Sequence, residues 1–346
     1  MDPITLEIIK GKLLSSVDEM GVVLARTSMS PVIYEVLDFA CGICDNKGNL
    51  ISQTNGVTLF TGTFSTQVKY IINKFGKNIS NGDIYLTNDP FTGGTHPCDF
   101  AIIKPIFFKN KIVTFSISVA HWIDVGGSIA GSLPPDSDSM FKEGIRFSGV
   151  KLCENETLLP DIVSIILENV RFPKFAMGDL NAQIAAVKIA DKRIKEAYEK
   201  YGSKKINVAF KKILLDSERQ SRKIISNLPN GIYKAKDCID GDGFVEDKIP
   251  IQISIEIKGS NIIFDYTGCP AVRNAPINCS LGALTSAVKT VFKALVEPFA
   301  PSNEGYFKPM KIVIPRNTVF SAEKPSPTGW YYEGVSQAAE LAWKAL

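Results

Sequence analysis

Several features that would mark other classes of protein are missing from this sequence. No stretch of about 18 apolar residues occurs, so we expect no membrane-spanning helix. The formal net charge is only +3 and the basic residues are spread along the chain, which does not favour nucleic-acid binding. The first residues form a polar, amphipathic pattern rather than a secretory signal. A GxxxxGK[ST] run is also missing, so nucleotide activation would require a partner.

Disulfide pairing is not indicated either. Seven cysteines, an odd number, occur without a secretory pattern, so we expect a reducing compartment and a cytoplasmic protein. Cys41 and Cys44 form the only close pair, and they lie in a predicted strand, where residues three apart point to opposite faces. We therefore interpret both as packing residues rather than as a metal or redox pair.

What is present predicts an ordinary globular protein of the α+β class, with mixed helices and antiparallel β-hairpins. Helical periodicity covers residues 3–27 and recurs on both sides of a turn at Gly202. We expect an α+β domain at 1–228 and a β-rich domain with a terminal helix at 229–346, where apolar and polar residues alternate. The last residues continue a helical pattern without a stop signal, so we expect the second domain to be incomplete or completed by a partner.

The only two histidines lie in one predicted hairpin, His96 just before its first strand and His121 at the end of its second. A short polar turn follows Phe108. If Phe108 faces Ile112 across that turn, Asp99 lies directly opposite His121, with Cβ atoms about 5 Å apart. A slip of one residue would turn His121 to the other face of the sheet.

Two imidazoles and one carboxylate that meet at one point form a metal site. His96 precedes Asp99 by three residues, and a turn at Pro97 can bring both side chains inward. This ligand set suits Zn, Mn or Fe(II) and leaves coordination positions open for substrate. The alternative is that both histidines are ordinary core or loop residues. We predict a divalent-metal site at His96, Asp99 and His121.

Residues close to these histidines are further candidates. Asp89 and Asp124 can accept the second N–H of a metal-bound imidazole or act as a general base, although either residue can instead stabilise a turn. Gly94 follows another glycine in a loop where the backbone can approach a ligand closely. We include Gly94 and Thr95 among the predicted substrate-binding residues.

Four segments together resemble the hydantoinase B/oxoprolinase family: NDPFTGGTHPCDF, AHWIDVGG with GSLPP three residues later, Glu143-Gly144, and NVRFPKFAMGDLNAQIAA. The resemblance runs from Leu6 to the last residue. The family includes the B-type chains of ATP-dependent N-methylhydantoinases, the C-terminal half of 5-oxoprolinases, and large subunits of acetone and acetophenone carboxylases. In the acetone carboxylase branch, the resemblance implies a manganese-type site at the positions of His96, Asp99 and His121.

The resemblance also implies contacts with a small-molecule substrate. Glu35 and Asp38 match acidic positions of the family and can line the same cleft, or else they are surface or capping carboxylates. Arg171 matches a position that could recognise a carboxylate or amide, or could hold helices against the hairpin. Asn278 lies in a loop that matches a family segment and is expected to face substrate.

The function implied is that of a metal-bearing subunit of an ATP-dependent cyclic amidohydrolase, acting on a hydantoin or a 5-oxoproline-like ring. An A-type partner would use ATP, giving a hetero-oligomer. Two departures, at residues 59–63 and at Trp122, replace histidines of many hydantoinase-type relatives and favour an alternative, carboxylation of a ketone through its enol phosphate. A non-catalytic scaffold is the third hypothesis.

Overall fold

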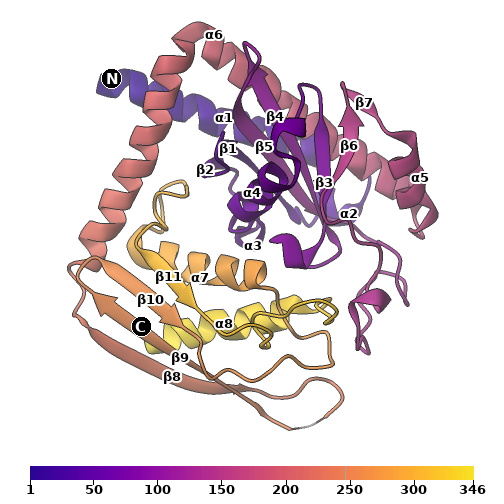
Figure 1. The fold of residues 1–346 in the computed structure, drawn as a ribbon, viewed down its shortest axis with the longest axis vertical. Helices are drawn as coiled ribbons and strands as arrows, with labels where there is room; N and C mark the ends of the chain where they lie inside the picture. The colour runs from indigo at the N-terminus through magenta and orange to yellow at the C-terminus, as the bar shows by residue number, and fades with distance from the viewer. Residues whose placement is uncertain (246) are drawn as a thin grey trace.

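The computed structural model describes residues 1–245 and 247–346, and it has the α+β fold that the sequence predicts. Two sheets form the frame of two units, and a long helix runs from one unit to the other (Figure 1). No helix in the described residues is both long enough and apolar enough to cross a membrane. All seven cysteines are free thiols.

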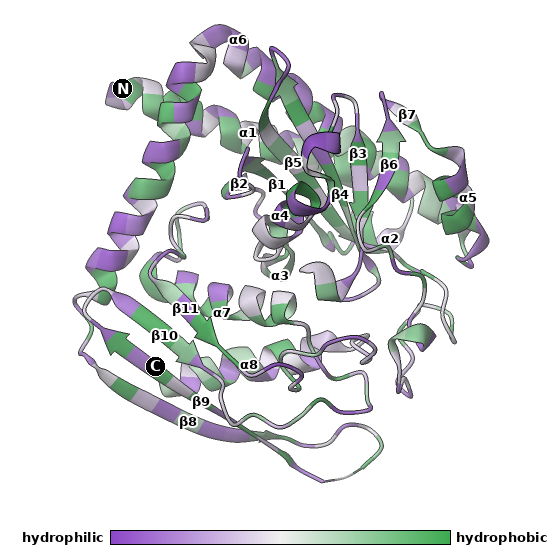
Figure 2. Ribbon diagram, in the orientation of Figure 1, coloured by the Kyte–Doolittle hydropathy of each residue, from purple (hydrophilic) through white to green (hydrophobic). Residues whose placement is uncertain are grey.

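The first unit contains a seven-stranded antiparallel sheet. Its order is β2-β1-β5-β4-β3-β6-β7, which places the predicted hairpin at the centre. The strands are β1 (Phe39–Asp45), β2 (Leu50–Gln53), β3 (Ile84–Thr87), β4 (Asp99–Phe108), β5 (Lys111–His121), β6 (Val150–Glu154) and β7 (Thr157–Leu158). The central strands β4 and β5 are mostly hydrophobic (Figure 2), because both faces of this sheet are covered.

The register of the central hairpin is the one predicted, since Asp99 pairs with His121. The predicted turn was wrong by one residue. Phe108 pairs with Lys111 rather than with Ile112, and the connecting residues Lys109 and Asn110 have φ values of 49° and 59°. Positive φ at both positions is typical of the two-residue turn that matches strand twist. A β-bulge next to Ile106 then adds one residue to β5 and restores the predicted register.

Helices cover both faces of this sheet. Alternate residues of β4 enter different cores, with Phe100 and Ile102 on the face of α1 and α6, and Ala101 and Ile103 on the face of α4. The main helices are α1 (Pro3–Thr27), α4 (Phe64–Phe75) and α6 (Pro173–Ile225). Shorter ones are α2 (Pro31–Tyr34), α3 (Thr58–Thr61), α5 (Pro160–Glu168), η1 (Gly76–Asn78), η2 (Pro90–Thr92) and η3 (Met140–Lys142).

The long helix α6 changes direction at Gly202, where φ is 74° and ψ is 152°. Its first half packs on the seven-stranded sheet, and its second half runs to the other unit (Figure 1). A residue with a side chain rarely adopts this backbone conformation, so glycine permits the bend. The turn predicted at this residue is confirmed.

The second unit has a four-stranded sheet, in the order β11-β10-β9-β8. Its strands are β8 (Gly231–Ile239), β9 (Ile249–Lys258), β10 (Asn261–Asp265) and β11 (Met310–Val313). The expected antiparallel sheet is only partly correct, because β11 runs parallel to β10. Helices α7 (Leu281–Val296) and α8 (Tyr331–Ala345) lie between this sheet and the first unit (Figure 1). A separate hydrophobic core begins at Ile225 and contains residues of this sheet, α7 and α8. The division at 228/229 stays a prediction.

Candidate metal centre

His96 and Asp99 are brought together by a tight turn before β4. The backbone N–H of Asp99 donates to the carbonyl of His96 at 3.1 Å, which closes the turn and places both side chains on one side. The His96 Nε2 atom lies 3.0 Å from Asp99 Oδ1. Both side chains are buried. The turn inferred from Pro97 therefore brings the side chains of His96 and Asp99 to the same site.

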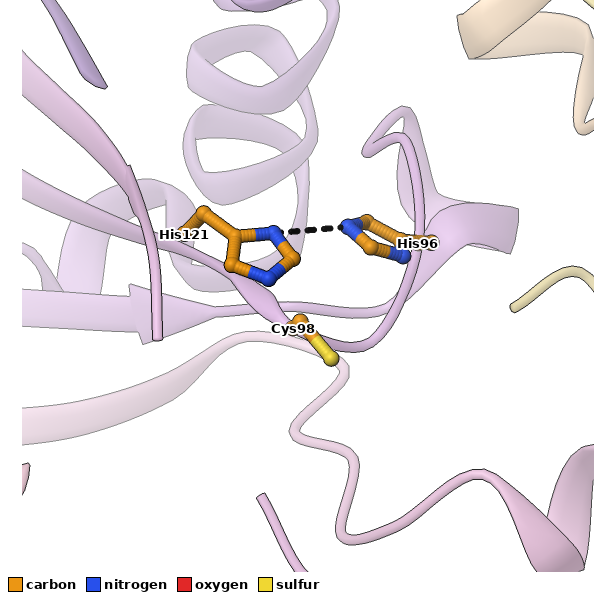
Figure 3. A group of neighbouring side chains, drawn as sticks. All are labelled: His96, Cys98 and His121. Atoms are coloured by element: carbon orange, nitrogen blue, oxygen red, sulfur yellow. Dashed lines mark hydrogen bonds between the residues drawn. The ribbon is translucent and has the colours of Figure 1, made fainter. Parts of the chain in front are cut away.

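His121 completes a triangle of possible ligand atoms. It ends β5 directly opposite Asp99, and its Nδ1 atom lies 3.1 Å from Asp99 Oδ1. The facing nitrogens of the two imidazoles, His96 Nε2 and His121 Nδ1, are 3.2 Å apart (Figure 3). Ligand bonds of roughly 2.1 Å at right angles would separate neighbouring ligand atoms by about 3.0 Å, so the triangle fits three adjacent corners of a metal's coordination shell.

The protonation of His96 also favours a cation at this point. Its other nitrogen, Nδ1, lies 3.0 Å from the carbonyl oxygen of Gly329. A carbonyl only accepts hydrogen bonds, so Nδ1 must carry a proton. Burial would lower the pKa of His96, but the charge of Asp99 outweighs it and raises that pKa, so without a metal Nε2 can also hold a proton towards Asp99. When Nε2 is unprotonated, it presents a lone pair. That lone pair faces the oxygen of Asp99 and the nitrogen of His121. A metal ion between them would satisfy all three groups, and the bond to Gly329 is the outer contact typical of metal-bound histidine.

A second carboxylate, Asp38, lies at the edge of this group. Its Oδ2 atom is 4.0 Å from His121 Nδ1, and 30% of its side chain is exposed. Burial and the nearby charge of Asp99 raise the pKa of Asp38. Burial alone would also raise the pKa of Asp99, but the two imidazoles outweigh it and hold that pKa well below its usual range. Asp38 was predicted to bind substrate, and its position allows it to act as a fourth ligand.

Cys98 is the other side chain close to both imidazoles. The possible ligand atoms of His96, Cys98 and His121 lie within 4.8 Å of one another. However, the sulfur points away from the contact between the imidazoles (Figure 3), towards the carbonyl of Ser132 at 4.0 Å. Burial, followed by the charge of Asp99, raises the pKa of the Cys98 thiol well above its usual value. Asp99 is therefore the better third ligand.

Two further residues surround the triangle. The hydroxyl of Thr95 donates to Oδ2 of Asp99, which leaves Oδ1 directed at the imidazoles. The ring of Tyr331, the first residue of α8, lies 4.8 Å from the His96 ring, measured between centroids. Thr95 was a predicted substrate-binding residue, and here it orients a ligand. Tyr331 belongs to the second unit, so the candidate centre is built from both units.

Asp124 and Arg171 hold each other rather than the imidazoles. Asp124 accepts from the backbone N–H groups of Gly126, Gly131 and Arg171 at 2.9–3.0 Å, and from the Arg171 guanidinium at 3.0 Å. Burial raises the pKa of Asp124, but these hydrogen bonds outweigh burial and lower it overall. A carboxylate that accepts four hydrogen bonds is a poor proton acceptor. The turn-stabilising alternative describes the geometry of Asp124 better than the catalytic one.

Asp89 and Asn278 are also committed to structural contacts. Asp89 is buried and accepts from Lys324 Nζ at 2.5 Å and from Phe91 N at 3.0 Å. Asn278 bonds to backbone groups of its own loop and to the carbonyl of Pro327. None of these contacts brings Asp89 or Asn278 to the two imidazoles.

The remaining predicted residues do not point to one common site. The carbonyl of Gly94 accepts from the Ser280 hydroxyl at 2.9 Å, which ties the loop before His96 to the start of α7. Glu35 is exposed at the end of α2. The structure therefore brings Asp38 and Thr95 to the triangle of possible ligand atoms. Gly94 is hydrogen-bonded to the start of α7, and Glu35 faces solvent.

Two positions that favoured a carboxylase point into the core. Trp122 stacks on Phe100 with ring centroids 4.0 Å apart, and its indole N–H donates to Gln183. Phe60 is buried in the core that also contains residues of α4. Both side chains are therefore packing residues in this structure.

The sequence interpretation missed Gly329, Tyr331 and the role of Glu143. Glu143 was noted only as part of a family motif, yet its buried carboxylate accepts from the backbone of Gly329. Gly329 lies 233 residues from His96, so no local spacing connects them. The glycine and aromatics at the start of the last helix were the only visible signal.

Comparisons with known proteins agree with this fold. The sequence profile described as hydantoinase B/oxoprolinase matches residues 2–346. An uncharacterized protein of Methanocaldococcus jannaschii is 34% identical over 350 residues, which cover 100% of this chain and 62% of that protein. The B chain of a putative D-/L-hydantoinase of a Pseudomonas species is 31% identical, with coverage of 100% and 61%.

Two solved structures superpose on the whole chain. The ATP-dependent caprolactamase from Pseudomonas jessenii gives a TM-score of 0.93 at 25% identity and is covered over 60% of its length. Nucleotide-free acetone carboxylase gives a TM-score of 0.93 at 19% identity and is covered over 48% of its length. This likeness concerns the fold alone. The chain spans about three fifths of the length of the Methanocaldococcus jannaschii protein and of the putative hydantoinase B chain. It belongs to the hydantoinase B/oxoprolinase family.

Proposed function

We propose that this chain carries the divalent-metal site of an ATP-dependent enzyme that hydrolyses cyclic amides. The observation that carries this proposal is the triangle of His96 Nε2, Asp99 Oδ1 and His121 Nδ1, with sides of 3.0, 3.1 and 3.2 Å. His96, Asp99 and His121 would hold the metal, with Asp38 as a fourth ligand. Imidazole and carboxylate donors suit Mn, Zn or Fe.

The metal would polarise a carbonyl oxygen and make water a stronger acid near neutral pH. The protein would orient the ligands, since Thr95 fixes the Asp99 carboxylate and Gly329 fixes the His96 ring. The His121 side chain is 16% exposed and that of His96 only 3%. Substrate would therefore approach from the side of His121 and Asp38.

The substrate we propose is a hydantoin, a 5-oxoproline-like ring or a related lactam. Relatives are named as the B chain of a hydantoinase and the beta chain of a caprolactamase, and the solved caprolactamase is called ATP-dependent. This sequence has no GxxxxGK[ST] run, so ATP would be used by an A-type partner in a hetero-oligomer. The activated substrate would pass from that partner to the metal site.

Carboxylation of a ketone-derived enol phosphate is the second candidate. The acetone carboxylase fold, at a TM-score of 0.93, is the observation that keeps it open. The two chemistries differ in their requirements when the chain is assayed with its partner. Release of an N-carbamoyl amino acid or an amino acid from a cyclic amide supports hydrolysis. A need for both bicarbonate and a ketone would replace hydrolysis by carboxylation.

Elemental analysis of the purified chain tests the metal site directly. We expect near-stoichiometric Mn, Fe or Zn in the wild type and its loss in His121→Ala and Asp99→Asn. Cys98→Ser is the matched control and should retain the metal, because its sulfur points away from the triangle. Absence of metal from all four proteins, after preparation with the partner, would leave the scaffold hypothesis.

A further inference from the structure

Glu143 is a buried carboxylate that accepts hydrogen bonds from one short backbone segment of the other unit. It follows η3 in the first unit, and its side chain is inaccessible to solvent. Its oxygens accept from the backbone N–H of Thr328 at 3.0 and 2.9 Å and from that of Gly329 at 2.8 Å. A charged carboxylate makes strong hydrogen bonds of this type, and breaking them inside the protein is costly.

The segment bound by Glu143, which contains Thr328 and Gly329, also orients His96. The carbonyl of Gly329 accepts from His96 Nδ1 at 3.0 Å. Gly329 thus binds Glu143 through its N–H and binds the proposed metal ligand His96 through its C=O. A Cβ atom at Gly329 would lie only 3.0 Å from Glu143 Oε1, so glycine permits this close approach.

Further contacts bind the same segment to the first unit. Met140 N donates to the Pro325 carbonyl at 3.0 Å, and the Trp330 indole donates to the Leu133 carbonyl at 3.0 Å. The segment 325–330 is therefore docked on the loop that leads to Glu143. This docking supplies the carbonyl that His96 needs.

We propose that Glu143 is a positioning residue for the metal centre, acting through Gly329 to hold His96 in the tautomer whose Nε2 is free. This inference rests on the proposed metal site and adds a role for a residue outside it. Docking of segment 325–330 and metal binding are then coupled. Because such coupling is reciprocal, bound metal also stabilises the docked segment.

Glu143→Gln tests the positioning role with little change of shape. The amide offers one oxygen, and its NH₂ group opposes the N–H groups of Thr328 or Gly329, which displaces the Gly329 carbonyl. We expect Mn²⁺ affinity, measured from the EPR signal of the free ion, to fall about 10–100-fold. Asp242→Asn is the matched control. Asp242 is also buried and accepts two backbone N–H groups, from Phe244 and Val245, within the second unit. It pairs in addition with Arg273 at 2.8 Å, so the control loses at least as much charge interaction.

A second readout reports the tautomer without metal. The chain has only two histidines, so ¹⁵N NMR of the imidazoles in the metal-free protein resolves each of them. Wild type and Asp242→Asn should show a proton at Nδ1 of His96, whether or not Nε2, which faces Asp99, also carries one. Glu143→Gln should show Nδ1 only partly protonated. A merely stabilising role of Glu143 would leave the tautomer unchanged.

The outcomes separate this inference from the proposed function. Failure of the wild type to bind Mn²⁺, Zn²⁺ or Fe²⁺ would reject the proposed metal site, while the tautomer measurement would still decide the role of Glu143. Metal binding with equal affinity and equal tautomer in Glu143→Gln would overturn the inference. If that variant does not fold, hydrogen exchange of the wild type decides. Exchange at Thr328 and Gly329 should slow when Mn²⁺ is bound, and unchanged exchange would overturn the coupling.

Discussion

The candidate centre depends on which nitrogen of each imidazole faces its neighbours. His96 is fixed by a backbone carbonyl, and His121 by its place opposite Asp99 at the end of β5. Two carboxylates, Asp99 and Asp38, bring negative charge to the same point. Ligand atoms about 3 Å apart beside that charge fit the coordination of a divalent cation.

Asp38 provides a residue-scale prediction. If it is a fourth ligand, Asp38→Asn should weaken Mn²⁺ binding by roughly tenfold or more, because a neutral amide is a poorer donor than a carboxylate. Glu35→Gln makes the same chemical change three residues away, at an exposed side chain, and should leave affinity unchanged. Titration of both variants with Mn²⁺ checks this. Equal affinities would return Asp38 to the substrate-binding role predicted from the sequence.

The sequence was sufficient to predict that His96, Asp99 and His121 lie together, but not to predict what orients them. Asp99 and His121 were paired from an assumed turn that placed Phe108 opposite Ile112, and the structure has that pairing of Asp99 with His121. Gly329 could not be predicted, since it lies 233 residues from His96 and their contact requires the docking of the two units. Likewise, a sequence does not reveal that the carboxylates of Asp89 and Asp124 are already occupied.

Among the elements, the β4–β5 hairpin shows how a wrong turn can still give the right register. Sequence reasoning placed Ile112 opposite Phe108, whereas a tighter turn pairs Phe108 with Lys111. The bulge offsets the difference by one residue, Val113, which lies beyond the end of the β1 pairing at Thr114. The pairing that places His121 therefore begins only after the bulge.

Deleting Val113 tests this description of the hairpin. The deletion should remove the bulge while Ile106 still pairs with Thr114, so that Asp99 stays opposite His121. We expect metal content to remain at the wild-type level, measured by elemental analysis. Deleting Ile117, inside the regular pairing, should shift His121 to the opposite face and abolish binding. Loss of metal in the Val113 deletion would show that the bulge itself positions the site.

Helices were predicted better than sheet pairings, for a physical reason. The first helix was placed at residues 3–27, and it begins at a cap, where Asp2 accepts from the N–H of Thr5 at 2.9 Å. Such signals are local. The parallel pairing of β10 with β11 was missed because the connection between them is long and includes α7. Such a crossover leaves no turn signal to read.

At the scale of the whole molecule, the two units are joined by buried polar contacts as well as by α6. Lys289 of α7 donates to the carbonyl of Gly62 at 3.2 Å and pairs with Glu304 at 3.3 Å. Glu304 also accepts from the Ser65 hydroxyl, and its N–H donates to the carbonyl of Leu50. Because the candidate centre takes Gly329 and Tyr331 from the second unit, contacts that hold the units together also preserve this centre.

Glu304→Gln should therefore destabilise the chain by about 3 kcal/mol near neutral pH, because Lys289 would remain buried without its partner. Burial would raise the pKa of Glu304, but Lys289 and Ser65 lower it below its ordinary 4.5. The contribution of the pair is thus complete above pH 4.5 and is lost as the pH falls through the lower value of the folded state. Denaturant unfolding of both proteins between pH 7 and about pH 3 should show the difference shrinking in acid.

Glu340→Gln, at an exposed glutamate of α8, should show neither effect. Replacing Lys289 by Met in the Glu304→Gln background should recover part of the loss, and no recovery would assign the loss to the side-chain contact with Ser65.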